Sequence, residues 1–299
     1  MIIRPKVNQF AILFTLKGSI AKRIALRALM VTLLASAIVL VEMLHPSNFT
    51  KVNATPFTLL GLSLSIFMNF RNNACYDRWY EARKAWGEVI VHVRSVIRET
   101  HVIRESAQRR LLLLNLAGFA HALNARLRRE DEAAASAEWI TPQHDAQVPD
   151  YSGRILQTVG QQGSDLHESG DLREWRYMLL ANHLTSLTQA QAVCERIKNT
   201  PLPFPYTLLL HRTIYLFCIL LPFAMAEPLG WLTPLFTAIV SYTFFGLDAI
   251  ADELEDPFGR DENDLPTDAL VRGIERDILA ELGTEPLPPA LKPVDYVLS

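Results

Sequence analysis

The run VNATPFTLLGLSLSIFMNF, residues 52–70, carries no charged side chain over 19 positions. An α-helix rises about 1.5 Å per residue, so this run can cross the roughly 30 Å hydrocarbon core of a bilayer. The alternative is a buried helix of a large soluble protein, in which an uncharged run of this length is uncommon. The run therefore predicts a membrane-spanning helix.

Three more uncharged runs lie outward from it, at residues 28–41, 213–226 and 228–247. The last is 20 residues long, and the two shorter runs reach a full span with their uncharged or interfacial neighbours. Four spans in two hairpins follow from this pattern. We therefore expect an all-α membrane protein with the lipid bilayer as its first partner.

The charged residues set the expected orientation. Basic residues before the first span and after the second place both ends of the first hairpin in the cytoplasm. The net charge of −3 shows no footprint of nucleic-acid binding. We expect a multi-pass protein of the cell (inner) membrane with both termini cytoplasmic. The basic residues are Arg4, Lys6, Lys17, Lys22, Arg23 and Arg27 before the hairpin, and Arg71, Arg78, Arg83 and Lys84 after it.

One stripe of the second span combines three large apolar side chains. Leu62, Ile66 and Phe70 recur at every fourth residue, and Gly61 and Ser65 supply small surfaces beside them. Spacing alone allows two interpretations. The stripe either contacts lipid and neighbouring helices, or it surrounds an axis in several copies and forms a hydrophobic constriction that gates by dewetting.

The segment FRNNACYDRWYEARKAWG, residues 70–87, extends the argument beyond spacing. It resembles the bestrophin family, particularly its bacterial members, and the resemblance continues in order through residues 18–22, 206–207 and 256–259. It implies a homopentameric ion channel with one central pore, lined by the second span at a neck and widening into a cytosolic vestibule. Leu62, Ile66 and Phe70 match the neck positions of that family.

The predicted organisation has five parts. These are a cytosolic N-terminal segment, 1–27; a first transmembrane hairpin with the pore neck, 28–70; a helical cytosolic region, 71–198; a second transmembrane hairpin, 199–247; and an acidic segment, amphipathic helix and tail, 248–299. Within the cytosolic region we expect 131–170 to be a loop with short helical pieces, because its periodicity is weak.

The resemblance also implies a second constriction at the cytosolic exit. Its register places Trp175 there, where an aliphatic residue is common in the family. Five indole rings would narrow the exit, and their π faces could favour cations. Alternatively, Trp175 caps a helix interface.

Two acidic patterns follow the fourth span. Asp248, Asp252 and Asp256 resemble the aspartate element of membrane prenyltransferases, which bind diphosphate through Mg²⁺. No second such element exists in the sequence, so this enzyme alternative is weak.

The stretch 256–264 resembles the Ca²⁺-binding clasp of animal bestrophins. Asp261 and Asp264 match its aspartate ligands, and Glu253 and Asp256 match positions that supply backbone carbonyl oxygens. Oxygen ligands suit a hard cation such as Ca²⁺. The alternative is a solvated acidic face, and no cofactor is required for conduction.

The expected function is a pentameric channel for small monovalent ions. The resemblance to bacterial members and the acidic balance favour cations. The alternative, implied by animal members, is a chloride channel of the same architecture, with activation by Ca²⁺ as a further option. The sequence contains no GxSxG, Walker A or GxGxxG motif, so we expect no enzyme activity. A secondary transporter is the remaining alternative.

Overall fold

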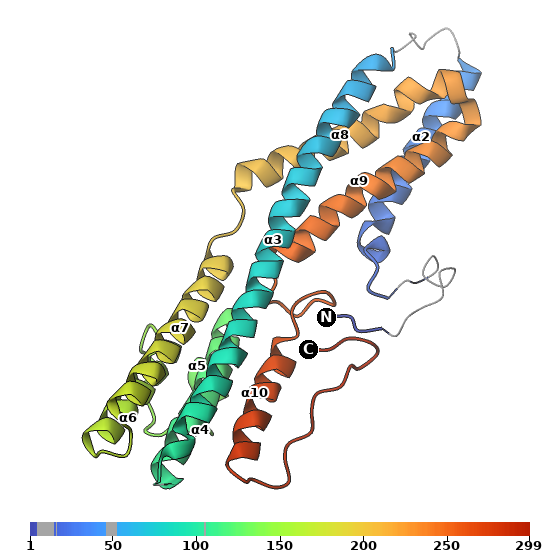
Figure 1. The fold of residues 1–299 in the computed structure, drawn as a ribbon. Coiled ribbons are helices and arrows are strands. Elements are labelled where there is room, and N and C mark those ends of the chain that lie inside the picture. The colour runs from blue at the N-terminus through green and yellow to red at the C-terminus, as the bar shows by residue number, and fades with distance from the viewer. Residues whose placement is uncertain (5–14, 16, 46–52, 105) are drawn as a thin grey trace. The chain divides into compact units, whose positions relative to one another are not determined.

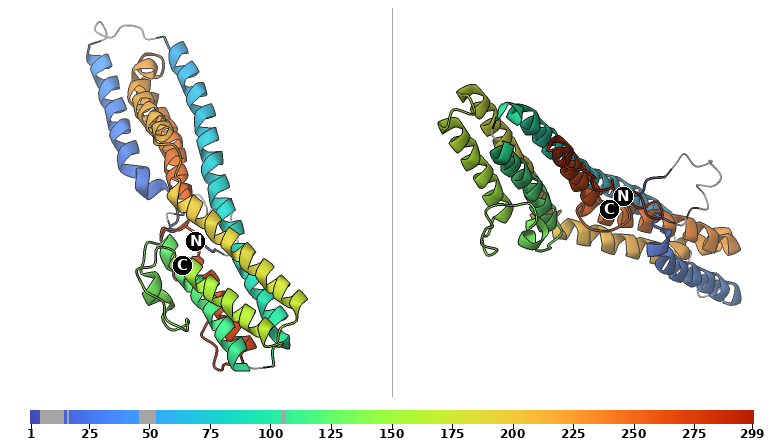
Figure 2. Two further views of the ribbon diagram at one scale, coloured as in Figure 1. Left: turned by 90° about the vertical axis from the view of Figure 1, so that its left-hand side faces the viewer. Right: turned by 90° about the horizontal axis from the view of Figure 1, so that it is seen from below.

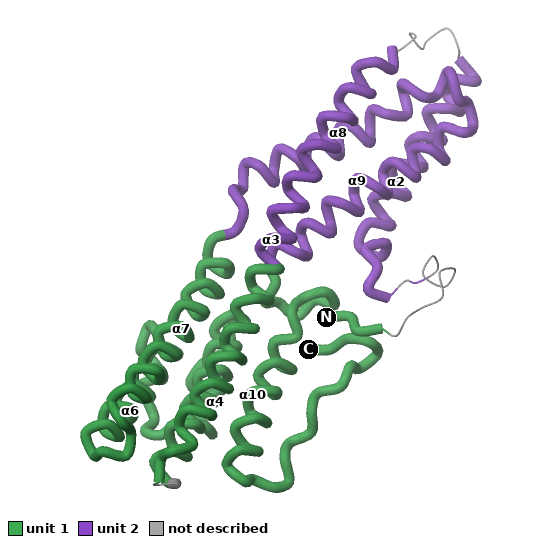
Figure 3. The backbone as a smooth tube through the Cα atoms, viewed as in Figure 1, with its two compact units in different colours: residues 1–4, 80–200, 257–299 green, residues 5–79, 201–256 purple. Residues whose placement is uncertain are grey.

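The computed structural model describes residues 1–4, 15, 17–45, 53–104 and 106–299, and the chain forms two compact units (Figures 1 and 3). Unit 1 comprises residues 1–4, 80–200 and 257–299, and unit 2 comprises 5–79 and 201–256. The described residues contain helices and isolated β-bridges only, which confirms the all-α class.

Unit 2 contains α2 (Ala21–Leu44), the first part of α3 (Thr55–Glu99), α8 (Phe204–Leu229) and α9 (Thr233–Glu255). Helices α2, α8 and α9 lie side by side (Figures 1 and 2). Their shared core includes Ile24, Leu64, Met68, Ile214 and Phe245, so the four helices close around one apolar interior.

The outer surface of unit 2 carries many large apolar side chains, among them Leu29, Leu33 and Leu216. Two helical stretches have the length and composition of membrane spans, Ala21–Leu44 and Phe204–Glu255. A helix that is apolar on every side suits a bilayer. The N-terminal part of α3 is long enough to span but contains more Ser, Thr and Asn residues, so it differs in composition from the lipid-compatible helices.

The turn between α8 and α9 differs from the expected position. The fourth span was expected to begin at Pro228, but Pro228 lies inside α8 and α9 begins at Thr233. Gly230 adopts a positive φ of 49° and starts the 3₁₀ turn η3 (Gly230–Leu232), a conformation that glycine tolerates without strain. The predicted loop between the first two spans includes residues 46–52, which, like Lys6, lie outside the described residues.

Unit 1 contains the rest of α3, η2 (Thr100–Val102), α4 (Ser106–Leu127), α5 (Glu132–Ser136), α6 (Tyr151–Glu168), α7 (Glu174–Asn199) and α10 (Thr267–Glu281). Helix α4 packs against α5, α6, α7 and α10. Its Leu112, Leu116 and Phe119 are fully buried and form the centre of this unit.

The expectation of a loop with short helical pieces at 131–170 is wrong for its second half. Helix α6 runs for 18 residues and is capped at its N-terminus by Asp150, whose carboxylate accepts a hydrogen bond from the Gly153 N–H at 3.0 Å. Ile155 and Val159 are fully buried on one face of α6. Many Gly and Gln residues obscured this amphipathic pattern, and the N-cap aspartate was the signal that could have revealed it.

A partly buried histidine gives unit 1 a testable dependence on pH. His121 stacks on Trp139 with ring centroids 5.2 Å apart, and its Nε2 lies 3.6 Å from Glu275 Oε2. Burial, assisted by nearby Arg272, lowers the pKa of His121 from 6.5 to about 4. Burial raises the pKa of Glu275, so this carboxyl is a poor counter-charge for an imidazolium.

We expect the stability due to neutral His121 to be complete above pH 6.5 and to decline as the pH falls toward 4. The loss from pH 6.5 to pH 5 should be about 1.5 kcal/mol. Denaturant unfolding of His121→Gln should lack this decline, whereas the exposed His101→Gln should retain it. Identical pH profiles for the wild type and His121→Gln would contradict the assignment.

Candidate functional site

The predicted neck stripe faces away from the core of its own subunit. Leu62, Ile66 and Phe70 on α3 are 60%, 50% and 60% exposed in the single chain. Leu64 and Met68, on the opposite side of the helix, are buried in the core of unit 2. The helix therefore keeps one apolar face for its own subunit and offers a second to another surface.

The small residue beside the stripe serves helix packing within the subunit. A Cβ atom on Gly61 would lie 3.1 Å from Phe217 Cζ, so the absence of a side chain lets α8 approach α3 closely. The packing interpretation of the sequence thus applies to Gly61. Leu62, Ile66 and Phe70 do not take part in this packing, because their side chains are at least half exposed.

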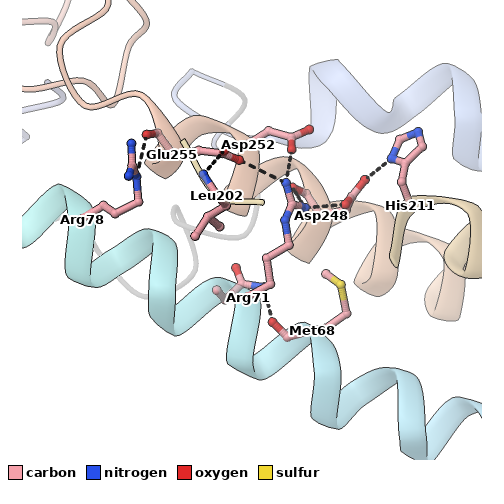
Figure 4. A network of polar contacts seen from close by, with 9 residues as sticks. Met68, Arg71, Arg78, Leu202, His211, Asp248, Asp252 and Glu255 are labelled. Carbon is pink, nitrogen blue, oxygen red and sulfur yellow. Dashed lines mark hydrogen bonds and ion pairs between the residues drawn. The ribbon is translucent and has the colours of Figure 1, made fainter. Parts of the chain in front are cut away.

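An ion-pair network holds α3 directly after the stripe (Figure 4). The Arg71 side chain is fully buried, and its Nη1 lies 2.7 Å from Asp248 Oδ1. Its Nη2 lies 2.5 Å from Asp252 Oδ1 and 3.6 Å from Glu255 Oε2. The second oxygen of Asp248 contacts His211 Nδ1 at 2.9 Å.

The network explains the aspartate spacing that resembled a prenyltransferase motif. Asp248 and Asp252 direct their carboxylates at the guanidinium of Arg71 (Figure 4). A buried charge near a membrane is costly unless it is paired within the helix bundle. The spacing therefore serves helix pairing, and the sequence signal that could have revealed it was an arginine at the end of an uncharged run.

Two further contacts strengthen the same end of the bundle. Arg78 Nε donates a hydrogen bond to the Glu255 backbone carbonyl at 3.3 Å, and the Leu202 N–H donates to Glu255 Oε1 at 3.1 Å. These contacts join α3, α9 and the segment that leads into α8 (Figure 4). Because Phe70 immediately precedes Arg71, the network fixes the direction in which the stripe points.

Trp175 lies in the first turn of α7 and is 53% exposed. The Arg176 guanidinium lies over its ring at 4.6 Å from the centroid. Arg176 Nη1 also donates to Glu99 Oε2 at 2.9 Å, which holds the guanidinium in place. One π face of Trp175 is thus already covered by a cation, which weakens the predicted attraction for permeating cations.

A cavity of about 440 Å³ adjoins Trp175. Its lining brings three guanidinium groups together with one carboxylate, and the side chains of Arg104 and Arg173 are exposed. The local charge is positive although the chain as a whole is negative. The lining residues are Val102, Arg104, Gly170, Asp171, Arg173, Trp175 and Arg176.

The residues predicted for Ca²⁺ belong to both units. Asp264 is buried, and its Oδ2 accepts a hydrogen bond from the Asp261 N–H at 2.7 Å. Asp256 follows the last turn of α9, and Glu253 contacts Arg23 at 3.2 Å. Throughout the described residues, no three His, Cys, Asp or Glu side chains gather as metal ligands. The Ca²⁺ site, half of which would consist of backbone oxygens, stays a prediction.

Comparison with known proteins identifies the family. A model described as Bacterial/Fungal Bestrophin protein matches residues 1–280. The chain belongs to the bestrophin family. A relative from Mesorhizobium japonicum, named a voltage-dependent anion channel-forming protein, is 40% identical over 293 residues, which cover 96% of this chain and 94% of the relative. A protein of the same description from Escherichia coli K12 is 38% identical and covers 93% of each chain.

A solved bestrophin homologue from Klebsiella pneumoniae has the same fold. Its TM-score is 0.83 at 37% sequence identity, covering 88% of this chain and all of that one. The chain is therefore a membrane protein and an ion channel, and the expectation that it is not an enzyme is confirmed. The names of its relatives fit the anion alternative better than the cation preference.

Proposed function

We propose that five copies of this chain form an anion-selective channel in the cell membrane. Leu62, Ile66 and Phe70 of each copy would line its neck, and Trp175 would narrow its cytosolic exit. Four helices of each subunit would cross the bilayer, with both termini in the cytoplasm. Small monovalent anions such as chloride are the expected cargo.

The exposed apolar stripe on α3 is the observation that carries the proposal. Leu62, Ile66 and Phe70 face away from the core while Leu64 and Met68 fill it. A helix with one face in its own subunit can place the other around a shared axis, where rings of large apolar side chains exclude water. The Arg71 network supports this arrangement because it fixes the orientation of the stripe.

The charge beside Trp175 favours anions over cations. Arg104 and Arg173 line the adjoining cavity, and Arg176 covers the indole ring. A narrow passage with positive side chains raises the local concentration of anions and lowers that of cations. Salt screens the interaction between charges that lie more than about 8–10 Å apart. The arginines beside Trp175 therefore act on a permeating ion more strongly than the net charge of the whole chain does.

We expect the current through the wild-type protein in a planar bilayer, recorded under a KCl gradient, to reverse its sign near the chloride equilibrium potential. Arg173→Glu should lower the chloride-to-potassium permeability ratio roughly tenfold, because each of five subunits exchanges a positive charge for a negative one at the exit. Arg154→Glu on α6 is the matched control, since it makes the same charge change at an exposed arginine that hydrogen-bonds Gln157.

The ratio should stay unchanged in Arg154→Glu. Wild-type reversal near the potassium potential would instead support the cation preference. Saturable coupled uptake without channel currents would support a transporter. If the permeability ratio shifts equally in Arg173→Glu and Arg154→Glu, the cavity beside Trp175 does not determine the selectivity.

A further inference from the structure

Two histidines of unit 1 face each other across a pair of helices. His92 lies on α3 and His183 on α7, and their Nδ1 atoms are 3.1 Å apart. The ring centroids are separated by 5.4 Å, with an angle of 46° between the planes. Channel conduction, as proposed above, makes no use of this pair.

The surroundings keep both imidazoles suited to metal binding. Glu88 Oε2 lies 3.5 Å from His92 Nε2, so a proton on Nε2 faces the carboxylate and the lone pair on Nδ1 faces His183. His183 Nδ1 faces His92 Nδ1 at 3.1 Å, so the same ring nitrogen of His183 can offer its lone pair to an ion held between the two rings.

The separation of the two nitrogens matches a shared metal ion. Bonds of about 2.0–2.1 Å to one tetrahedral Zn²⁺ place two nitrogens roughly 3.3 Å apart. The observed 3.1 Å is close to this value, so slight rotation of either ring would admit the ion. A direct hydrogen bond between the imidazoles also fits the distance, and metal binding would replace its proton.

Open space lies beside His92 for the other ligands of a metal. His92 and Glu88 line a cavity of about 310 Å³ between α3 and α7, with Glu81, Lys84, Ser186 and Gln189 among its other lining residues. No third His, Cys, Asp or Glu completes a ligand set among the described residues. Water would fill the remaining positions of the tetrahedron.

We propose that His92 and His183 bind a divalent transition-metal ion, Zn²⁺ or Cu²⁺, with Glu88 orienting His92. Nitrogen ligands favour these ions over Ca²⁺ and Mg²⁺, which prefer oxygen. The bound ion links α3 to α7, the helix whose first turn carries Trp175. With two protein ligands, the dissociation constant should be on the order of 10 µM.

Titration of the full-length protein in detergent with Zn²⁺ at pH 7.5, against a chromophoric chelator, tests the site. We expect about one ion per chain at this affinity, with at least tenfold weaker binding in His92→Ala and in His183→Ala. Cu²⁺ electron paramagnetic resonance should show nitrogen coupling from two imidazoles in the wild type and from one in either variant. This signal reports ligation in folded protein independently of channel activity.

His101→Ala is the matched control, because His101 Nδ1 contacts Glu281 at 3.3 Å and thus forms a histidine–carboxylate pair on an exposed surface. It should bind both ions as the wild type does. Zn²⁺ affinity that survives in His92→Ala or His183→Ala, or that falls equally in His101→Ala, would overturn the proposal. A wild-type Cu²⁺ spectrum with a single coupled nitrogen would also contradict the proposal, and the two histidines would then form only a hydrogen bond with each other.

Discussion

Simultaneous replacement of Leu62, Ile66 and Phe70 with Ala is expected to raise anion flux through reconstituted channels at least about tenfold. Five copies of each side chain form three apolar rings in the proposed neck, and such rings empty of water when the passage is narrow. Alanine leaves a wider passage that stays hydrated, so the free-energy barrier for ions falls. Chloride efflux from liposomes measures the change directly.

Two exposed apolar residues of α9 provide the matched control. Leu235 and Ile239 are 55% and 54% exposed and belong to a different helix from the stripe. Their replacement with Ala should leave the flux near the wild-type value, provided that size-exclusion chromatography shows intact assemblies. Unchanged flux in the triple variant, or an equal rise of the flux in the control, would show that the stripe does not form the gate.

The sequence predicted those features that depend on local pattern. Uncharged runs identified the helices of unit 2, and four-residue spacing placed Leu62, Ile66 and Phe70 on one face. The structure adds that this face lies opposite Leu64 and Met68. Periodicity alone could not distinguish the two faces, because both are apolar and the choice depends on which one packs against α8 and α9.

Features that depend on distant residues escaped the sequence. Arg71 and Asp248 are 177 positions apart, and no local spacing links them. The sign of the charge near Trp175 was also hidden, because net charge averages the whole chain whereas Arg104, Arg173 and Arg176 gather at one cavity. The aromatic ring by itself suggested cations, and its covering by Arg176 changes that inference.

Arg71→Ala should be the most destabilising single substitution in unit 2. The carboxylate of Asp248 is 1% exposed and would lose its ionic partner while remaining buried. Removing one member of a buried ion pair costs about 3–5 kcal/mol, because the remaining charge is left without compensation. The apparent melting temperature in detergent and the yield of assembled protein should both fall strongly.

Two further variants separate this charge effect from loss of packing. Arg78→Ala, on the same helix, removes a hydrogen bond to the Glu255 carbonyl and should cost only about 1 kcal/mol. Arg71→Ala combined with Asp248→Ala should recover part of the stability lost in Arg71→Ala, because no unpaired carboxylate stays buried at position 248. If the double variant is no more stable than Arg71→Ala, or if Arg78→Ala is equally damaging, the pairing of Arg71 with Asp248 does not hold α3 in place. If the double variant recovers stability but not chloride flux, Arg71 also orients Phe70 and the rest of the stripe toward the pore.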